Sequence, residues 1–286
     1  MSDELRLSRR PLGRTGLQVS QLALAAMAIR GKNPPGLKLT PEDVERAYHE
    51  HGFNTFLVTR QMGAMAEGVR RLIKAGHRDD LVLIGESGLL PFGPTLRSGC
   101  EKNIVALGTD RLDVWLMGWV RGRWHVAGGA WPTMRALKAE GKVRAIGFSC
   151  HDRPLATALA KELAIDVLMI RYNAAHRGAE REVFAPLGSE RPGIIAYTAT
   201  RWGMLLQPLP KQGFPAAMTA PECYRFSLSN PAVDTVLCAA RSAGEIRDDA
   251  AGAAAGTLSE ERLGEVRRFG DAVHEAARGG LRWMFR

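Results

Sequence analysis

The chain has no long uninterrupted apolar segment. Its longest uncharged apolar runs, such as LALAAMAI and LVLIG, fall far short of the roughly 20 residues that a membrane-spanning helix requires. The first residues, MSDELRLSRR, mix charges of both signs and lack the basic and then apolar pattern of a secretion signal. We therefore expect a globular protein of the cytoplasm that has no membrane partner.

Cysteines are few and widely spaced. The chain has four, Cys100, Cys150, Cys223 and Cys238, with no CxxC pair and no histidine-rich neighbour. This spacing signals neither a metal site nor a disulfide framework, so we expect no bound metal and reduced thiols.

Nucleic-acid-binding motifs are also missing, although the charge balance is basic. Lys and Arg number 39 against 30 Asp and Glu, a formal net charge of +9. The basic residues are scattered and are not interleaved with aromatic residues, so we expect no nucleic-acid partner. The surplus favours a small anionic ligand, and arginines on solvated faces are the alternative. An oligomer remains compatible with this composition.

Eight short apolar runs recur along the chain, and most are separated by helical patterns. The runs are QLALAAM, NTFLV, DLVLIG, DVWLMG, RAIGFS, DVLMI, GIIAY and DTVLCA. Thr40 and Pro41 predict the start of one helix, and Ser259 predicts the start of a last helix that ends near Gly279. The tract AAGAAAG, residues 250–256, is interpreted as a connection before that helix.

Strands that are apolar on both faces and alternate with helices predict a parallel sheet. Eight units of about 30 residues each match a (β/α)8 barrel, in a single domain over residues 1–286. The competing architecture, an open doubly wound sheet, requires a glycine-rich phosphate turn after its first strand, and none is present.

Five segments resemble aldo-keto reductases. They are RPLGRTGLQVSQLALAAM at the start, LGTDRLDVWLMGW, MRALKAEGKVRAIGFS, DVLMIRYNAAHR with GIIAYTATRWGML, and RFSLSNPAVDTVLCAARSAGEIRDD. The resemblance implies a (β/α)8 barrel with a short N-terminal β-hairpin. It also raises the expectation of the family's reaction, carbonyl reduction with a nicotinamide cofactor.

The resemblance assigns the family's catalytic Asp, Tyr, Lys and His to four positions that differ here, namely Leu57, Met62, Glu86 and Gly118. A thioether has no proton to donate, so general acid catalysis at Met62, typically worth about 10²- to 10⁴-fold, is expected to be absent. Classical carbonyl reduction is therefore not expected.

The cofactor positions are changed in part. The resemblance places Cys150 and Met169 where the family holds the nicotinamide amide with Asn and Gln side chains. It retains candidate contacts to the nicotinamide ring and the phosphate, which are Ser149, Tyr197, Arg241 and Ser242. We expect either no cofactor or weakly bound NADP(H) held by these four residues.

Side chains at the carboxyl ends of barrel strands converge on one pocket. Glu86 follows the apolar run LVLIG, so its pKa is expected to be raised, which suits a general acid or base. Arg60, Arg121 and His151 are the accompanying candidates, and Arg171, His176 and Arg201 belong to the same inventory of strand-end residues. A salt bridge from Glu86 to Arg60 or Arg121 is the structural alternative.

Three functions stay open on these residues. The first is an enzyme that kept the barrel and performs acid/base chemistry on a small anionic substrate. The second is a non-catalytic protein that binds a ligand or serves as a scaffold. The third is an atypical NAD(P)H-dependent reductase whose substrate needs no tyrosine acid. The substrate, the oligomeric state and the role of the C-terminal tail are open as well.

Overall fold

The computed structural model describes residues 6–25, 38–59, 61–88 and 92–279. Eight parallel strands close into a barrel in the order β10-β3-β4-β5-β6-β7-β8-β9. All eight apolar runs of the sequence form these strands, so the predicted barrel is confirmed. Their bounds are β3 Leu22–Ala25, β4 Thr55–Leu57, β5 Val82–Glu86, β6 Leu112–Val120, β7 Val143–Cys150, β8 Val167–Arg171, β9 Gly193–Tyr197 and β10 Thr235–Cys238.

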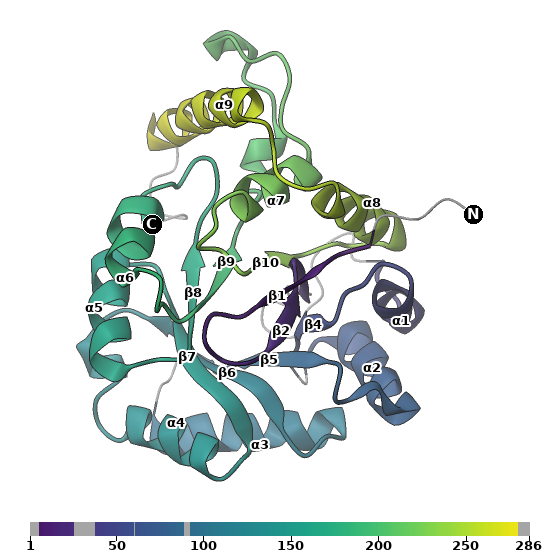
Figure 1. Cartoon of the computed structure of the whole chain (residues 1–286), viewed down its shortest axis with the longest axis vertical. Helices are drawn as coiled ribbons and strands as arrows, with labels where there is room; N and C mark the ends of the chain where they lie inside the picture. The colour runs from purple at the N-terminus through teal and green to yellow at the C-terminus, as the bar shows by residue number, and fades with distance from the viewer. Residues whose placement is uncertain (1–5, 26–37, 60, 89–91, 280–286) are drawn as a thin grey trace.

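Helices surround this barrel (Figure 1). The α-helices are α1 Pro41–His49, α2 Gly63–Leu72, α3 Gly93–Leu107, α4 Ala130–Ala139, α5 Arg153–Leu163, α6 Ala185–Leu187, α7 Ala220–Leu228, α8 Ala243–Ala254 and α9 Glu260–Gly279. Short helical turns of other types cover Ile73–His77, Arg123–His125, Glu180–Phe184, Met204–Leu206 and Pro210–Gln212. The predicted cap of α1 is confirmed, because the Thr40 hydroxyl accepts from the Asp43 backbone N–H while the Asp43 carboxylate accepts from that of Thr40.

Most of the alanine-rich tract at residues 250–256 is helical, and only Ala255 and Gly256 belong to the connection that the sequence suggested. Helix α8 continues through Ala254, as the high helix propensity of alanine favours. A Cβ atom at Gly252 would lie 2.3 Å from Cβ of Pro221, so this glycine lets α8 approach α7 closely. For residues 250–254 the prediction of a connection was wrong, because it interpreted a packing glycine as a loop signal.

One end of the barrel is closed by the N-terminal hairpin of β1 Arg9–Pro11 and β2 Gln18–Ser20, which lies across the strands in Figure 1. Leu12, Leu17 and Val19 of this hairpin join the cluster of side chains that fills the barrel interior. At Gly13, a Cβ atom would lie 2.3 Å from the backbone N of Gly193. The hairpin therefore seals the end where the strands begin.

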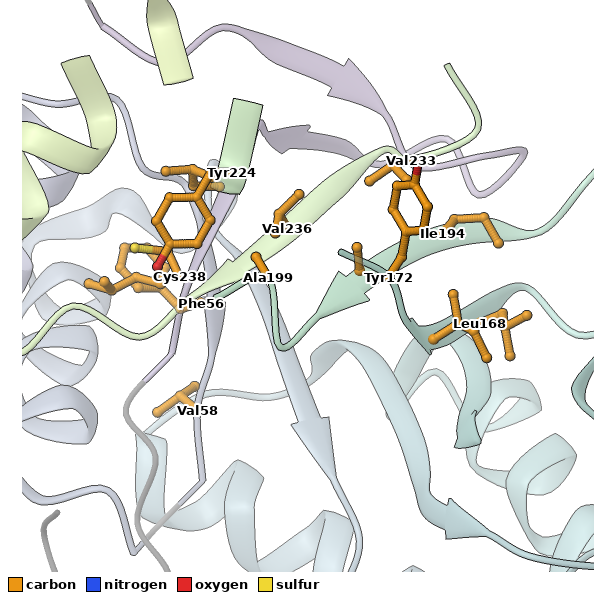
Figure 2. Close-up of a cluster of buried hydrophobic side chains, with 14 of the residues drawn as sticks. Phe56, Val58, Leu168, Tyr172, Ile194, Ala199, Tyr224, Val233, Val236 and Cys238 are labelled. Atoms are coloured by element: carbon orange, nitrogen blue, oxygen red, sulfur yellow. The ribbon is translucent and has the colours of Figure 1, made fainter. Parts of the chain in front are cut away.

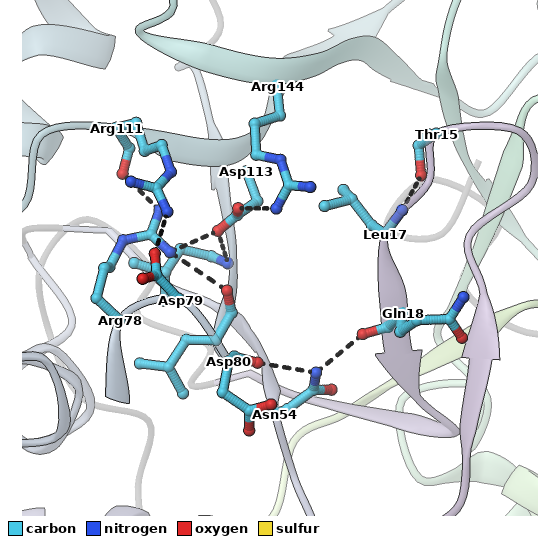
Figure 3. A network of polar contacts seen from close by, with 12 residues as sticks. Thr15, Leu17, Gln18, Asn54, Arg78, Asp79, Asp80, Arg111, Asp113 and Arg144 are labelled. Carbon is cyan, nitrogen blue, oxygen red and sulfur yellow. Dashed lines mark hydrogen bonds and ion pairs between the residues drawn. The ribbon is translucent and has the colours of Figure 1, made fainter. Parts of the chain in front are cut away.

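A buried carboxylate also fixes the sealed end (Figure 3). Asp113 of β6 is fully buried, and its carboxylate accepts a hydrogen bond from the backbone N–H of Leu83 at 2.9 Å. It forms ion pairs with Arg78 at 3.0 Å and Arg144 at 3.2 Å. Because Leu83 belongs to β5 and Arg144 to β7, this group ties three neighbouring strands together.

The helices pack on the outer face of the barrel through a second apolar layer (Figure 2). Within it, Tyr224 of α7 and Cys238 of β10 point toward each other. The Cys238 thiol donates to the carboxylate of Asp249 on α8 at 3.4 Å. Burial raises the pKa of Asp249 to about 7, so α7, α8 and β10 share a polar contact inside an otherwise apolar layer.

Candidate functional site

The open end of the barrel presents the carboxyl ends of the strands, and Glu86 is the last residue of β5. Its Oε1 atom accepts a hydrogen bond from the hydroxyl of Ser149, on β7, at 2.7 Å. The same hydroxyl accepts from the backbone N–H of Trp119 at 2.7 Å. Ser149 is buried, and its hydroxyl both donates to Glu86 and accepts from Trp119, which orients the Glu86 carboxyl.

Burial raises the pKa of Glu86 to about 7, and the hydrogen bond from Ser149 offsets only part of this effect. No ion pair joins Glu86 to Arg121, although both residues are described. The alternative of a salt bridge from Glu86 to Arg121 was therefore wrong. The alternative of a salt bridge to Arg60 stays a prediction, because Arg60 lies outside the described residues. At neutral pH both protonation states of Glu86 are populated, as general acid/base catalysis requires.

Gly118 makes room for this carboxyl. A Cβ atom at position 118 would lie 2.4 Å from the carbonyl oxygen of Ser87 and 3.3 Å from Cγ of Glu86. The backbone N–H of Gly118 instead donates to the Ser87 hydroxyl at 3.0 Å. Any side chain at this position would displace the strand end that carries Glu86.

A β-bulge follows directly. The pairing of β6 with β7 is irregular between Met117 and Val120, and Trp119 adopts a left-handed conformation with φ of 52°. Bulges re-aim residues at the rims of barrels. Here the bulge directs the N–H of Trp119 to Ser149 and leaves its indole 46% exposed.

Leu57 and Met62 lie on the neighbouring part of the opening. Leu57 ends β4 and is buried in the interior cluster, and Met62 precedes α2 and packs partly buried against it. Neither side chain carries a proton that can be transferred, whereas Glu86 on the next strand does.

Tyr197 and His151 form a pair at the rim. The Tyr197 hydroxyl lies 3.0 Å from Nδ1 of His151, and the two rings meet edge to face at 5.6 Å. Burial raises the pKa of Tyr197, whereas burial and then the charges of Arg171 and Arg121 lower that of His151. The sequence had assigned these residues separate roles, as cofactor contact and catalytic candidate, and the structure brings them together.

Arg171 ends β8, and Arg201 lies in the loop after β9. Among the described residues, neither guanidinium forms an ion pair with a carboxylate. Arg121 is exposed at the rim. Burial lowers the pKa values of His125 and His151, and the Arg121 charge adds to this effect. The basic side of the opening is therefore formed by β8 and β9 as well as by the loop that carries Arg121.

The nicotinamide positions carry other contacts. The Ser149 hydroxyl is engaged by Glu86 and Trp119. The Cys150 thiol donates to the carbonyl of Asp152, and burial raises its pKa to about 11. Met169 is buried in the barrel interior and has no amide group.

The phosphate positions are also engaged. The Arg241 guanidinium forms an ion pair with Glu245 at 2.9 Å, and the Arg241 backbone N–H donates to the same carboxylate at 2.8 Å. The Ser242 hydroxyl caps α8 by accepting from the backbone N–H of Glu245. A carboxylate thus occupies the position beside Arg241 and the start of α8, where an anion would otherwise be favoured.

The described parts of the chain contain neither a candidate metal site nor a helix suited to a membrane. In those parts, no group of three or more His, Cys, Asp or Glu side chains is arranged to hold a metal ion. No helix within the same residues combines the length and apolar character needed to cross a bilayer.

Comparisons with known proteins agree with this architecture. Residues 95–213 match the model of the aldo/keto reductase family. A D-threo-aldose 1-dehydrogenase from Pseudomonas sp. is 29% identical over 121 residues, which are 41% of this chain and only 37% of that relative.

Two solved structures resemble nearly the whole chain. The holo form of an aldo-keto reductase from Bacillus halodurans has a TM-score of 0.73 at 18% identity, covering 92% of this chain and 96% of the other. A putative aldo-keto reductase from Pseudomonas aeruginosa has a TM-score of 0.69 at 22% identity, covering 88% of this chain and 98% of the other. The chain therefore has the barrel fold of the aldo-keto reductases, and its central segment matches the sequence model of that family.

Proposed function

We propose that this chain is an aldo-keto reductase relative that has lost the catalytic tetrad and performs acid/base chemistry on a small anionic substrate. The observation that carries the proposal is the half-buried Glu86, whose pKa the surrounding protein raises to about 7 and whose carboxyl accepts a hydrogen bond from Ser149. Such a group suits an isomerase, lyase, cyclase or dehydratase that needs no redox cofactor.

The proposed chemistry is a proton transfer. As a carboxylate, Glu86 takes a proton from the substrate, and as a carboxylic acid it returns the proton to another substrate atom. Ser149 donates to Oε1, and no described residue donates to Oε2, which is therefore the oxygen assigned to the transfer. Because the proton is returned, the cycle is balanced without an oxidant or reductant.

The described residues do not fit a nicotinamide cofactor, which also supports the proposal. The Ser149 hydroxyl is engaged by Glu86, Met169 offers no amide, and Arg241 is paired with Glu245. Binding the cofactor in the family's manner would require Ser149 to leave Glu86 and a phosphate to displace the Glu245 carboxylate. No step of the proposed reaction therefore involves NAD(P)H.

An NAD(P)H-dependent oxidoreduction is the alternative, favoured by the partial match to an aldose dehydrogenase. In that case the cofactor must stabilise the folded protein in proportion to its binding. Adding NADPH would then raise the melting temperature, and a substrate would be required to oxidise it.

Exchange of substrate protons with solvent tests the proposal before the substrate is known. The protein is incubated in D2O, without nucleotide, with a panel of small hydroxy acids, oxo acids and phosphate esters, and 1H NMR follows each C–H signal. We expect at least one compound to lose a C–H signal, and the Glu86→Gln variant to slow this exchange by about 10²- to 10⁴-fold.

The matched control is Glu261→Gln, which removes an exposed carboxylate on α9 and should leave the exchange rate unchanged. Exchange that survives Glu86→Gln would overturn the role of Glu86. Conversion that requires NADPH, together with a rise in melting temperature on adding it, would replace the proposal by oxidoreduction. A panel without any exchange would favour the non-catalytic alternative.

A further inference from the structure

Two arginines at the open end of the barrel are largely withdrawn from water without a counter-charge. Arg201 is only 7% exposed, and its Nη1 atom is buried with no hydrogen-bond partner. Arg171 is half-buried, and its Nε atom is also buried and unpartnered. An unpaired guanidinium in this position is costly, because burial removes water that no protein acceptor replaces.

Two other shielded arginines of this chain are paired with carboxylates, whereas the half-buried Arg10 donates instead to the backbone carbonyls of Leu228 and Val233. Arg78 pairs with Asp113 at 3.0 Å, and Arg191 pairs with Asp234 at 2.7 Å. For Arg171 and Arg201, no described carboxylate lies within ion-pair distance. The contrast within one molecule indicates that these two guanidiniums are reserved for an acceptor that is not part of the described chain.

The two side chains belong to one electrostatic cluster. Burial and then the Arg171 charge lower the pKa of Arg201. Burial and then the charges of both arginines bring the pKa of His176 to about 3. His176 is therefore neutral at physiological pH and adds no charge. The cluster thus presents two positive charges and a neutral imidazole to whatever it binds.

The loop after β9 holds Arg201 in a strained conformation. Thr198, Arg201 and Trp202 all have positive φ values, of 56°, 50° and 57°. The side-chain amide of Asn173 donates to the carbonyl of Thr198 at 2.8 Å and fixes the loop to the end of β8. Strain of this kind in residues other than glycine collects at ligand sites, where the surrounding structure maintains it.

We propose that Arg171 and Arg201 form an oxyanion subsite, which takes a phosphate or carboxylate group carrying up to two negative charges. A planar guanidinium donates two parallel hydrogen bonds to such a group, and two guanidiniums neutralise a dianion. The subsite rests on the proposed function only in assigning this anion to the substrate. The sequence had predicted Arg60 and Arg121 as the arginines of the site. The subsite adds Arg171 at the end of β8 and Arg201 in the loop after β9.

Tyr197 lies beside the subsite, because it pairs with Arg171 across β8 and β9. Burial raises its pKa, and the charges of Arg171 and Glu86 act on the same hydroxyl. A substrate anchored by its oxyanion at Arg171 would share the open end of the barrel with the Glu86 carboxyl, since both residues end their strands there. Phosphate monoesters and dicarboxylates of a few carbons have suitable charge for this arrangement.

Thermal unfolding in the presence of inorganic phosphate or malonate tests the subsite at constant ionic strength. We expect each anion that binds to raise the melting temperature of the wild-type protein in a saturable way. The anion with the lower half-maximal concentration identifies phosphate or carboxylate as the preferred group. Arg201→Gln and Arg171→Gln should each abolish the shift.

The melting temperatures of the variants without anion are a second readout. If the arginines served only the stability of the fold, these temperatures would fall. Removing an uncompensated buried charge should leave the melting temperature of Arg201→Gln equal to or above that of the wild type. Arg135→Gln, which removes an exposed charge on α4, is the matched control and should keep the anion shift. Glu86→Gln should also keep it, so failure of the acid/base proposal and failure of the subsite are distinguishable.

Three results would overturn the subsite. The first is the absence of any saturable shift in the wild type with either anion. The second is a shift that persists in both arginine variants. The third is a melting temperature that falls in both variants without anion, which would assign these arginines to the stability of the fold.

Discussion

At the scale of single residues, the position of Glu86 at the open end of the barrel depends on the absence of a side chain at Gly118. Glu86 and Gly118 share one space, since a Cβ on Gly118 would lie 3.3 Å from Cγ of Glu86. The Glu86 carboxyl can therefore occupy its present position only because residue 118 has no side chain. A histidine at position 118, as the family resemblance would place there, is incompatible with the present position of Ser87.

The Gly118→Ala substitution tests this relation. The added methyl group would meet the Ser87 carbonyl oxygen at 2.4 Å, and backbone atoms yield less readily than a flexible side chain. We expect the free energy of unfolding to fall by about 1–3 kcal/mol, as overpacking typically costs. Urea denaturation measures the change. Gly244→Ala is the control, because its new Cβ would make only an ordinary contact of 3.9 Å. Equal stability of Gly118→Ala and wild type would contradict the crowding described for this position.

The sequence was sufficient to predict which residues lie at the strand ends, but not which hydrogen bonds they form with one another. Glu86 was expected at a strand end with a raised pKa, and both features are found. Its hydrogen bond to Ser149 joins residues 63 positions apart, and Ser149 had been assigned to the cofactor. Such pairs depend on the register of neighbouring strands and on a bulge in β6, neither of which the hydrophobic pattern specifies.

At the scale of elements, caps and apolar periodicity were sufficient for most of the barrel. Ser259 accepts from the backbone N–H of Arg262, as predicted for the start of α9, and this helix is described through Gly279. Residues 250–254 were interpreted wrongly, because a glycine that packs against another helix looks the same in the sequence as a glycine in a loop. Interhelical contact is the missing information.

The contacts of Asp113 at the sealed end of the barrel predict how much its replacement destabilises the protein. Asp113 of β6 is fully buried, so Asp113→Asn leaves Arg78 and Arg144 without their shared counter-charge. We expect the free energy of unfolding to fall by about 3–5 kcal/mol, since removing one partner leaves the other charge shielded from water. Chemical denaturation followed by circular dichroism measures it.

Asp79→Asn is the comparison for that experiment. Asp79 pairs with Arg111, but its side chain is 92% exposed, and exposed pairs contribute only about 0–1 kcal/mol. If both variants lost the same stability, the buried carboxylate would have no special role in tying β5, β6 and β7 together.

At the scale of the whole molecule, the barrel is sealed at one end and carries its titratable groups at the other. The hairpin and Asp113 close the end where strands begin, whereas Glu86, Tyr197 and Arg171 lie where strands finish. This division of roles between the two ends is general for such barrels. The fold could be predicted from eight apolar runs, but the extent of a single domain over residues 1–286 stays a prediction.

The arginines behind the net positive charge of the chain fall into two groups, those paired at the surface and those shielded without a carboxylate partner. Many arginines, such as Arg9, Arg97 and Arg262, are paired with carboxylates at the surface, as expected for solvated faces. Arg171 and Arg201 are different because they are shielded and unpaired among the described residues. Net charge alone could not separate these groups, since the distinction depends on burial and on neighbours from distant parts of the chain.

The pH dependence of folding follows from the sign of the Glu86 shift. Its pKa is about 7 in the folded state, against about 4.3 for an unperturbed glutamate in the unfolded chain. Between these values the folded state binds more protons, so the free energy of unfolding falls as pH rises toward and through 7. Asp249, with its pKa also raised to about 7, contributes a slope of the same sign.

The most direct measurement is therefore the free energy of unfolding of wild type and Glu86→Gln as a function of pH. The glutamine stays neutral, and the Asp249 contribution cancels in the difference between the two proteins. We expect the difference to change steadily from about pH 5 to above pH 7, in favour of the variant, by on the order of 3 kcal/mol in total. A difference that stays constant over this range would show that Glu86 titrates normally, which contradicts its assignment as the acid and base of the site.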